Sequence, residues 1–195
     1  EAGISVIVLD GDALAPGIQI ADISLVVDIT DINATINAVV NCGVRPSGAI
    51  SFVNEAGMLA AGAIRDEFEL PGASFAVTEN LTDKIKQRKS WAKTNLPNPV
   101  WLAVDGSVDS VEIRKIFQGA IIVKPADSAG SRGISVINVD DDIQKAILIA
   151  LACSKSGRAI IESFIIGTEY TVESFGSKSY GHQVLAVTEK TKVEE

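Results

Sequence analysis

The chain has 195 residues, a net charge of −8 and 47% apolar residues. This length allows one large domain or two smaller ones with buried cores, and the composition is that of a folded, globular protein. The negative charge argues against nucleic acid or an anionic membrane as a partner, and no apolar run is long enough to cross a bilayer. A phosphorylated ligand would therefore have to bind locally, through a few lysines and backbone amides.

The cysteines and the start of the chain bear on the cellular compartment and on processing. Cys42 and Cys153 lie in apolar, helix-like stretches, which favours reduced core thiols in a cytoplasmic protein. No signal peptide precedes the first strand pattern. The chain begins at Glu1 and its only methionine is Met58, so we expect a processed chain or an internal piece of a longer protein.

The first seventy or so residues alternate short β-rich apolar runs with helical patterns. Thr30 or Asp31 is a candidate cap for a helix that ends at Gly43, and a second helix stops before Pro71. Such alternation predicts a parallel sheet with crossover helices, as in part of a doubly wound domain. The strands predicted here are 4–10, 23–29 and 48–54.

Beyond the Pro71-Gly72 turn the pattern becomes α+β, and we place a boundary near residue 80. A polar helix at 80–95 has Thr82 or Asp83 at its start, and helices are also predicted at 108–117 and 141–155. Closely spaced strands dominate the end of the chain. The strands predicted in this part are 100–104, 120–124, 134–139, 158–165, 168–175 and 180–190.

A lysine followed by a loop of small residues suggests an anion site in "AIIVKPADSAGSRGISVINV", residues 120–139. In a P-loop the lysine follows the glycines and opens a helix, whereas Lys124 precedes them and an extended run follows. A dinucleotide fingerprint fails for the same reason. The remaining interpretation is a β-hairpin whose tip brings backbone amides to an anion, or an ordinary exposed turn with a surface lysine.

Three stretches together resemble a known superfamily. "TDKIKQR" (82–88), "IIVKPADSAGSRGISVI" (121–137) and "IIESFIIGTEYTVE" (160–173) occur in the order of the nucleotide-binding motifs of the ATP-grasp superfamily. That superfamily includes biotin carboxylase, carbamoyl-phosphate synthetase, D-alanine–D-alanine ligase and the L-amino-acid ligases. The similarity covers about 83–189, and the preceding stretch resembles the Rossmann-like domain found before the grasp.

The resemblance implies a fold and a division of the chain. The fold would be α/β and α+β, a partial Rossmann-like domain followed by an incomplete ATP-grasp fold with a small β-hairpin lid. The Rossmann-like domain would span 1–79, without its first strand. The first ATP-grasp lobe and lid would span 80–157, and the start of a second lobe 158–195.

The resemblance also assigns phosphate-binding roles. Lys84 matches the lysine that reaches the ATP phosphates from the first lobe. Lys124 matches the lysine that contacts phosphate and the adenine side. The loop that closes over the triphosphate corresponds to Ser128 to Gly133, with Ser128, Gly130, Ser131 and Gly133 as its binding residues.

Residues of the third motif would hold the nucleoside. Glu162 matches the carboxylate that accepts a hydrogen bond from the adenine amino group. The backbone around Phe164 and Ile165 resembles the segment that contacts the adenine edge, and Glu169 matches the acid that holds the ribose hydroxyls.

Elementary chemistry bears on three of these residues. Glu162 interrupts an apolar strand, so it must face a cleft or pair with a cation such as Lys124. Strand alternation alone cannot put Glu169 on the same side seven residues later, although Gly167 offers a bend. For Glu169 the alternative is an exposed edge-strand position. For Lys84 it is a solvated helix face shared with Lys86 and Arg88.

The implied activity is that of an ATP-dependent ligase. It would activate a small-molecule carboxylate as an acyl phosphate for attack by an amine or similar nucleophile, with Mg²⁺ ligands downstream of this chain's end. We expect this chain by itself to be inactive, and a homodimer is one assembly that the resemblance allows. The alternatives are a non-catalytic nucleotide-binding or scaffold module of the same fold, and a Rossmann-type oxidoreductase with a nicotinamide cofactor.

Overall fold

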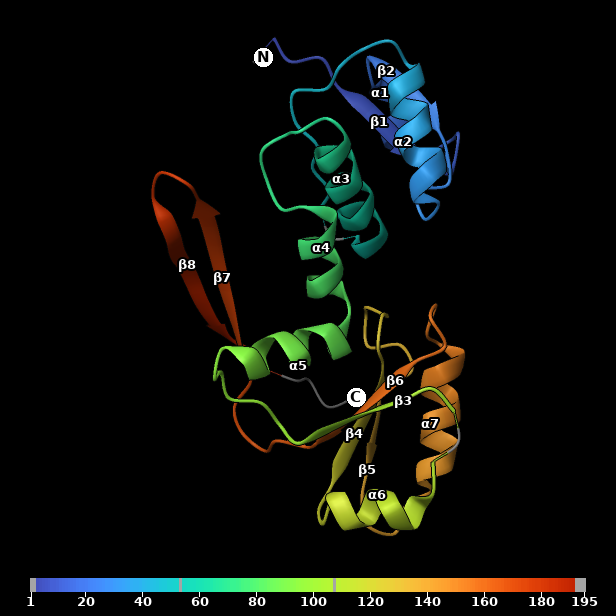
Figure 1. Cartoon of the computed structure of the whole chain (residues 1–195), viewed down its shortest axis with the longest axis vertical. Coiled ribbons are helices and arrows are strands. Elements are labelled where there is room, and N and C mark those ends of the chain that lie inside the picture. Colours follow the sequence, from blue (N-terminus) through green and yellow to red (C-terminus); the bar gives the residue numbers. More distant parts are fainter. Residues whose placement is uncertain (1–2, 53, 107, 192–195) are drawn as a thin grey trace. The chain divides into compact units, whose positions relative to one another are not determined.

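The computed structural model describes residues 3–52, 54–106 and 108–191 (Figure 1). Its contacts divide the chain into two compact units, Glu1–Ser163 and Phe164–Glu195. The architecture is mixed α/β, as the sequence predicts, with three small sheets. The predicted domain boundaries at residues 79 and 157 stay predictions. Within the described ranges no helix is both long and apolar enough to span a bilayer.

The chain opens with a parallel pair of strands. β1 (Ile7–Asp10) pairs in parallel with β2 (Ile23–Val26), and the short helix α1 (Pro16–Ile20) connects them. α2 (Ile32–Asn41) then begins after Asp31, whose side chain accepts a hydrogen bond from the backbone N–H of Ala34 at 2.9 Å. This N-cap satisfies one of the free amides of the first turn. The predicted parallel pairing is confirmed.

The third predicted strand, at 48–54, is wrong for the residues of it that are described. Residues 48–52 and Asn54 lie outside any strand, and Val53 lies outside the described residues. Ile50 and Phe52 are each 77% exposed, so no neighbouring layer covers these β-prone side chains in the described structure. β propensity needs a partner strand to take effect. Asn54 instead caps α3 (Glu55–Glu67) by accepting from the Gly57 N–H.

A helix that the sequence analysis missed follows the Pro71-Gly72 turn. α4 (Phe75–Thr82) begins after Ser74, whose hydroxyl accepts from the Val77 N–H at 3.3 Å. It packs against both α3 and α5 (Lys84–Lys93). Asp83 ends α4 and caps α5, and it accepts from the Lys86 N–H at 3.0 Å. Of the two predicted caps for α5, Asp83 is therefore the correct one.

The main sheet is antiparallel and has the strand order β3-β6-β4-β5 (Figure 1). Its strands are β3 (Trp101–Val104), β4 (Ile121–Pro125), β5 (Ser135–Ile137) and β6 (Ala159–Ser163). α6 (Ser110–Ile116) and α7 (Ile143–Ala152) supply the helical side of the core on one face. Fully buried members of this core include Ile113, Ile121, Val123, Ile147 and Ile161.

The opposite face of the sheet carries the charged residues of interest. Alternation along β6 puts Ile160 and Glu162 on this face and Ile161 on the other. A second small core joins Ile160 to Ala126 and to Ile85 of α5, with Trp101 packed against it. Ile85 therefore anchors α5 to the side of the sheet that the larger core leaves free.

The second unit is a long antiparallel hairpin. β7 (Tyr170–Ser177) pairs with β8 (Gly181–Glu189), with a register shift between Glu173 and Ser174. All nine residues of β8 are exposed. The strands predicted at 168–175 and 180–190 are thus confirmed, while the residues between β6 and β7 form no strand.

The two cysteines lie at helix ends rather than in a core. Cys42 caps the C-terminus of α2 and is partly exposed, and Cys153 does the same for α7 and is exposed. The prediction of core thiols is therefore wrong, because each cysteine lies one residue beyond the end of its helix, past the last buried position. Both thiols are free, as expected.

Two isoleucines of α6 test the assignment of the main core. Ile113 is fully buried and Ile116 is 48% exposed. We expect Ile113→Ala to lower the free energy of unfolding by about 2–5 kcal/mol, because it leaves a cavity in a packed core. Ile116→Ala, the matched control, should cost less than about 1 kcal/mol. Chemical denaturation measures both, and equal losses would contradict this packing.

Candidate functional site

A buried carboxylate is the centre of the site. Glu162 is 2% exposed, and in the sheet its neighbours are Trp101 on β3 and Ile122 on β4. Two cations reach it from different elements. The Lys124 ammonium lies 2.5 Å from Oε2, and Nε of Arg88 on α5 donates to Oε1 at 2.5 Å. The expected pairing of Glu162 with Lys124 is present, and Arg88 completes it.

Both cations affect the acidity of Glu162. Burial alone would raise the pKa of its carboxyl group, since a charged group is penalised away from water. Hydrogen bonds and charge from Arg88 and Lys124 outweigh burial and hold the pKa of Glu162 below its ordinary value. The group is therefore ionised at neutral pH, an acceptor without a proton to give.

Lys84, the first residue of α5, lies at the base of the glycine loop. Its ammonium donates to the Ser128 carbonyl at 2.7 Å, and its backbone N–H donates to the Ala126 carbonyl at 2.8 Å. Burial lowers the pKa of Lys84, the carboxylate of Glu55 raises it, and the charge of Lys124 lowers it. The two lysines are thus close enough to repel, as expected of a pair that shares one polyanionic ligand.

The base of the loop is fixed by hydrogen bonds to the turn that follows α7. The Asp127 carboxylate accepts from the Ser154 hydroxyl at 2.7 Å and from the backbone N–H groups of Lys155 and Ser156. Burial acts to raise the pKa of Asp127, and these hydrogen bonds lower it further than burial raises it. Nearby, Nη2 of Arg158 lies 2.6 Å from the Asp83 carboxylate.

The loop itself joins β4 and β5, as the hairpin prediction requires. Three of its residues have positive φ: Gly130 (68°), Ser131 (57°) and Gly133 (72°). A Cβ on Gly133 would lie 2.6 Å from the Cβ of Cys153, so only glycine fits there, whereas open space surrounds Gly130. A turn of small residues and glycines lets backbone N–H groups approach an anion closely, which suits this loop to a phosphate.

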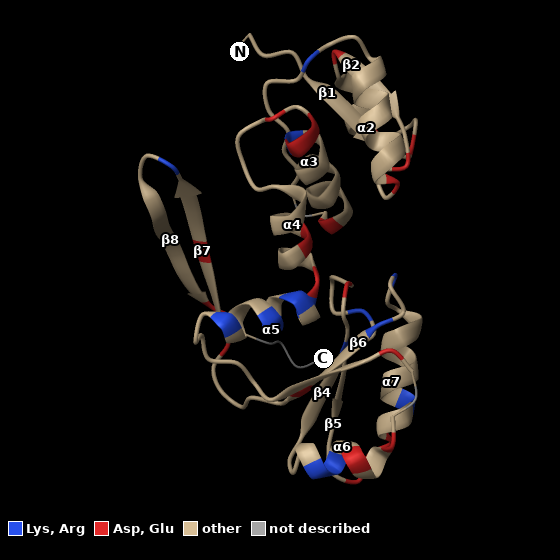
Figure 2. Ribbon diagram, in the orientation of Figure 1, with Lys and Arg blue, Asp and Glu red and all other residues tan. Residues whose placement is uncertain are grey.

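A cleft of about 510 Å³ lies between this loop and the N-terminus of α3. Asp127, Ser128, Ala129 and Arg132 line it from the loop, and Asn54, Glu55 and Ala56 line it from α3. Charges of both signs therefore face this space. Figure 2 shows the basic residues along α5 and near the loop, in an otherwise acidic protein.

The predicted site residues fall into two sets. Lys84 contacts the loop at Ser128, and Lys124 contacts Glu162, all within the first unit. The other predicted loop residues, Gly130, Ser131 and Gly133, belong to the same β4–β5 connection.

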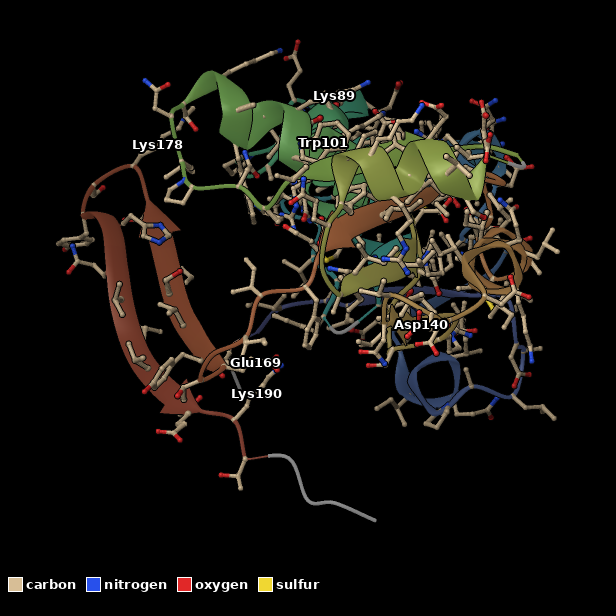
Figure 3. All side chains as sticks on the ribbon, turned by 90° about the horizontal axis from the view of Figure 1, so that it is seen from below. Lys89, Trp101, Asp140, Glu169, Lys178 and Lys190 are labelled. Carbon is tan, nitrogen blue, oxygen red and sulfur yellow. The ribbon has the colours of Figure 1, made fainter. Side chains whose placement is uncertain are left out.

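Phe164, Ile165 and Glu169 belong to the second unit. Within that unit the Glu169 carboxylate lies 2.8 Å from the ammonium of Lys190 (Figure 3). The nucleotide-binding roles of all ten predicted residues stay predictions.

Sequence analysis missed Arg88 as a partner of Glu162. The signal was present, because Arg88 follows Lys84 by four residues on a helix and so lies on the same face as the lysine. Nothing in the sequence indicated, however, that Arg88 reaches β6, because Glu162 lies 74 residues further along the chain.

Comparison with known proteins gives partial matches over much of the chain. No family model matches. The D-alanine–D-alanine ligase of Albidiferax ferrireducens is 29% identical over 111 residues, which are 57% of this chain and 32% of the ligase.

Solved structures match over nearly the whole chain. An N5-carboxyaminoimidazole ribonucleotide synthetase, solved as an ADP complex, superposes with a TM-score of 0.76 at 18% identity, over 97% of this chain and 48% of that one. The L-amino acid ligase of Bacillus licheniformis gives a TM-score of 0.72 at 19% identity, over 99% and 46%. The chain therefore spans from a third to half the length of these proteins.

The lysine-and-glycine hairpin, the buried glutamate and these similarities together point to one class of protein. The chain has the fold of ATP-grasp proteins and is similar in sequence to members of that superfamily.

The ion-pair cluster makes a prediction about stability and pH. Glu162→Gln leaves two buried cations without a counter-charge, so we expect a loss of about 3–5 kcal/mol in the free energy of unfolding at pH 7. The pKa of Glu162 is lower folded than unfolded, so its contribution is present above the ordinary value of 4.5 and is lost as pH falls through the folded value. The difference in the free energy of unfolding between the wild type and the variant should therefore become smaller below about pH 4.5. Chemical denaturation at a series of pH values measures it.

The control is Glu112→Gln, which removes the partner of Lys115 in an exposed i,i+3 pair on α6. It should cost less than about 1 kcal/mol. The buried pairing would be contradicted if the free energies of unfolding of the wild type and Glu162→Gln differed little at pH 7, or if their difference did not change with pH.

Proposed function

We propose that this chain is the ATP-binding portion of an ATP-dependent ligase that activates a carboxylate as an acyl phosphate for attack by an amine or similar nucleophile. The observation that carries the proposal is a pair of electrostatically coupled lysines at the two ends of one site: Lys84 contacts the glycine-rich loop at Ser128, and Lys124, which precedes the loop, pairs with the ionised Glu162. The matched D-alanine–D-alanine ligase and L-amino acid ligase are named for chemistry of this kind, which supports the reaction class.

The residues present suit a nucleoside triphosphate. Lys84 and Lys124 supply two positive charges, and the backbone amides of 128–133 supply neutral donors that can approach closely. In this proposal ATP supplies the phosphoryl group, and the chain holds its phosphates and neutralises charge that grows during transfer. Asp127 fixes the base of the loop against the turn after α7 through its three hydrogen bonds.

Magnesium is typical of phosphoryl transfer from ATP. The described residues contain no group of three or more side chains of the kinds that usually hold a metal ion.

Lys124 is the first residue to test. We expect Lys124→Ala to weaken ATP binding by about 1.5–3 kcal/mol, the scale of a charge-assisted hydrogen bond. Isothermal titration of the complete gene product with ATP measures the change.

The matched control is Lys115→Ala, which deletes an exposed lysine of α6. It should leave the dissociation constant unchanged. ATP binding that is as tight in Lys124→Ala as in the wild type would contradict the assignment.

The competing function is a nucleotide-binding or scaffold module without ligase chemistry. A ligase should hydrolyse ATP faster when a carboxylate substrate and an amine are supplied together, because the acyl phosphate is consumed. We therefore expect a panel of amino acids and other small carboxylic acids to contain at least one that stimulates phosphate release by the complete gene product. Binding of ATP with no stimulation by any member would favour the non-catalytic module.

A further inference from the structure

The carboxylate of Glu162 has acceptor capacity left over. An ionised carboxylate offers about four lone-pair positions. Nε of Arg88 uses one at Oε1, and Nζ of Lys124 uses one at Oε2. Each oxygen can therefore accept one further hydrogen bond, and neither can donate one.

The side chain of Arg88 is fixed in a position where its positive charge pairs with the Glu162 carboxylate. Its guanidinium stacks over the ring of Trp91, 4.5 Å from the ring centre, and its side chain is 12% exposed. In the described part of the chain, Glu162 is the acid that forms an ion pair with Arg88, and the buried atom Nη1 has no hydrogen-bond partner. The guanidinium is thus fixed by packing, with Glu162 as the counter-charge.

Lys124, by contrast, is not reserved for Glu162. In the role that the resemblance implies, its ammonium contacts phosphate and the adenine side of ATP, so its charge is shared with the ligand. Arg88 comes from α5 and reaches Glu162 from the opposite oxygen. When a bound nucleotide also interacts with the Lys124 ammonium, Arg88 is the cation that still pairs with Glu162 alone.

We propose that Arg88 is a specificity-determining residue for the nucleotide base. By keeping Glu162 ionised, Arg88 makes the carboxylate an obligate acceptor, which pairs with the 6-amino group of adenine and repels the 6-oxo group of hypoxanthine or guanine. The inference rests on the proposed function, together with the contact to the adenine amino group that the ATP-grasp resemblance implies for Glu162.

The groups around Glu162 decide which way its protonation moves without Arg88. Lys124 faces it from β4 and Arg88 from α5, while its sheet neighbours Trp101 and Ile122 carry no charge. Burial pushes the pKa of Glu162 upward and the two cations push it downward. Loss of Arg88 therefore favours the protonated carboxyl group, which can donate to a 6-oxo oxygen.

The test compares ATP with inosine triphosphate, which carries a 6-oxo group and lacks the 2-amino group of guanine. Dissociation constants are measured for the complete gene product and for Arg88→Met between pH 6 and pH 8.5. We expect the wild type to prefer ATP over this whole range. Arg88→Met should lose about tenfold of that preference at pH 6, the scale of one hydrogen bond, and the loss should not grow as the pH rises.

Three further variants separate charge from structure. Arg88→Gln keeps a donor but no charge, so it should relax the preference as Arg88→Met does, and it replaces that variant if Arg88→Met does not fold. Arg88→Lys keeps the charge and should keep the preference. Lys89→Met deletes an exposed lysine one residue further along α5 (Figure 3) and should change nothing.

The outcomes distinguish this inference from the proposed function. Failure of the wild type to bind ATP would overturn the proposed function. A wild type that prefers ATP, with the same preference in Arg88→Met or Arg88→Gln, would overturn the inference alone. A loss in Arg88→Lys as large as in those variants, or a wild-type preference that vanishes by pH 6, would also overturn it.

Discussion

The buried carboxylate of Glu162 is the constraint on which the candidate site depends. It is charged, almost fully covered, and held by one cation from α5 and one from β4. Because an unpaired buried charge is costly, the helix and the two strands must come together in this arrangement. The same two ion pairs then fix Lys124 at the end of its strand and Arg88 on the helix face that also carries Lys84. A stability requirement and the proposed ligand site thus share the same atoms.

The sheet divides its two faces between packing and chemistry. One face buries a continuous apolar core against α6 and α7, with no charged member. The other face has a small apolar patch around Ile160 and the ion-pair cluster beside it. The packed core keeps the positions of Lys124 and Glu162 precise, while the β4–β5 loop supplies the small residues and positive φ angles beside them. Such a division suits a site that must hold a flexible, highly charged ligand.

Sequence patterns gave the local parts of this site and missed the long-range ones. Asp83 as a cap, Lys84 on α5, and the hairpin around Lys124 follow from capping and alternation, which are short-range effects. The stretch at 48–52 has β propensity but no partner strand in the described structure, so the prediction of a strand failed there. The pairing of Arg88 with Glu162 joins residues 74 positions apart, and no local pattern encodes such a contact.

The central claim is that a nucleoside triphosphate binds on the charged face of this sheet, between α5 and the β4–β5 loop. Hydrogen exchange of the complete gene product with and without a non-hydrolysable ATP analogue tests it most directly. The account predicts slower amide exchange in 121–133, 159–163 and the first turn of α5, with no change in β1 and β2. Protection confined to β1 and β2, or none in the β4–β5 loop, would contradict it.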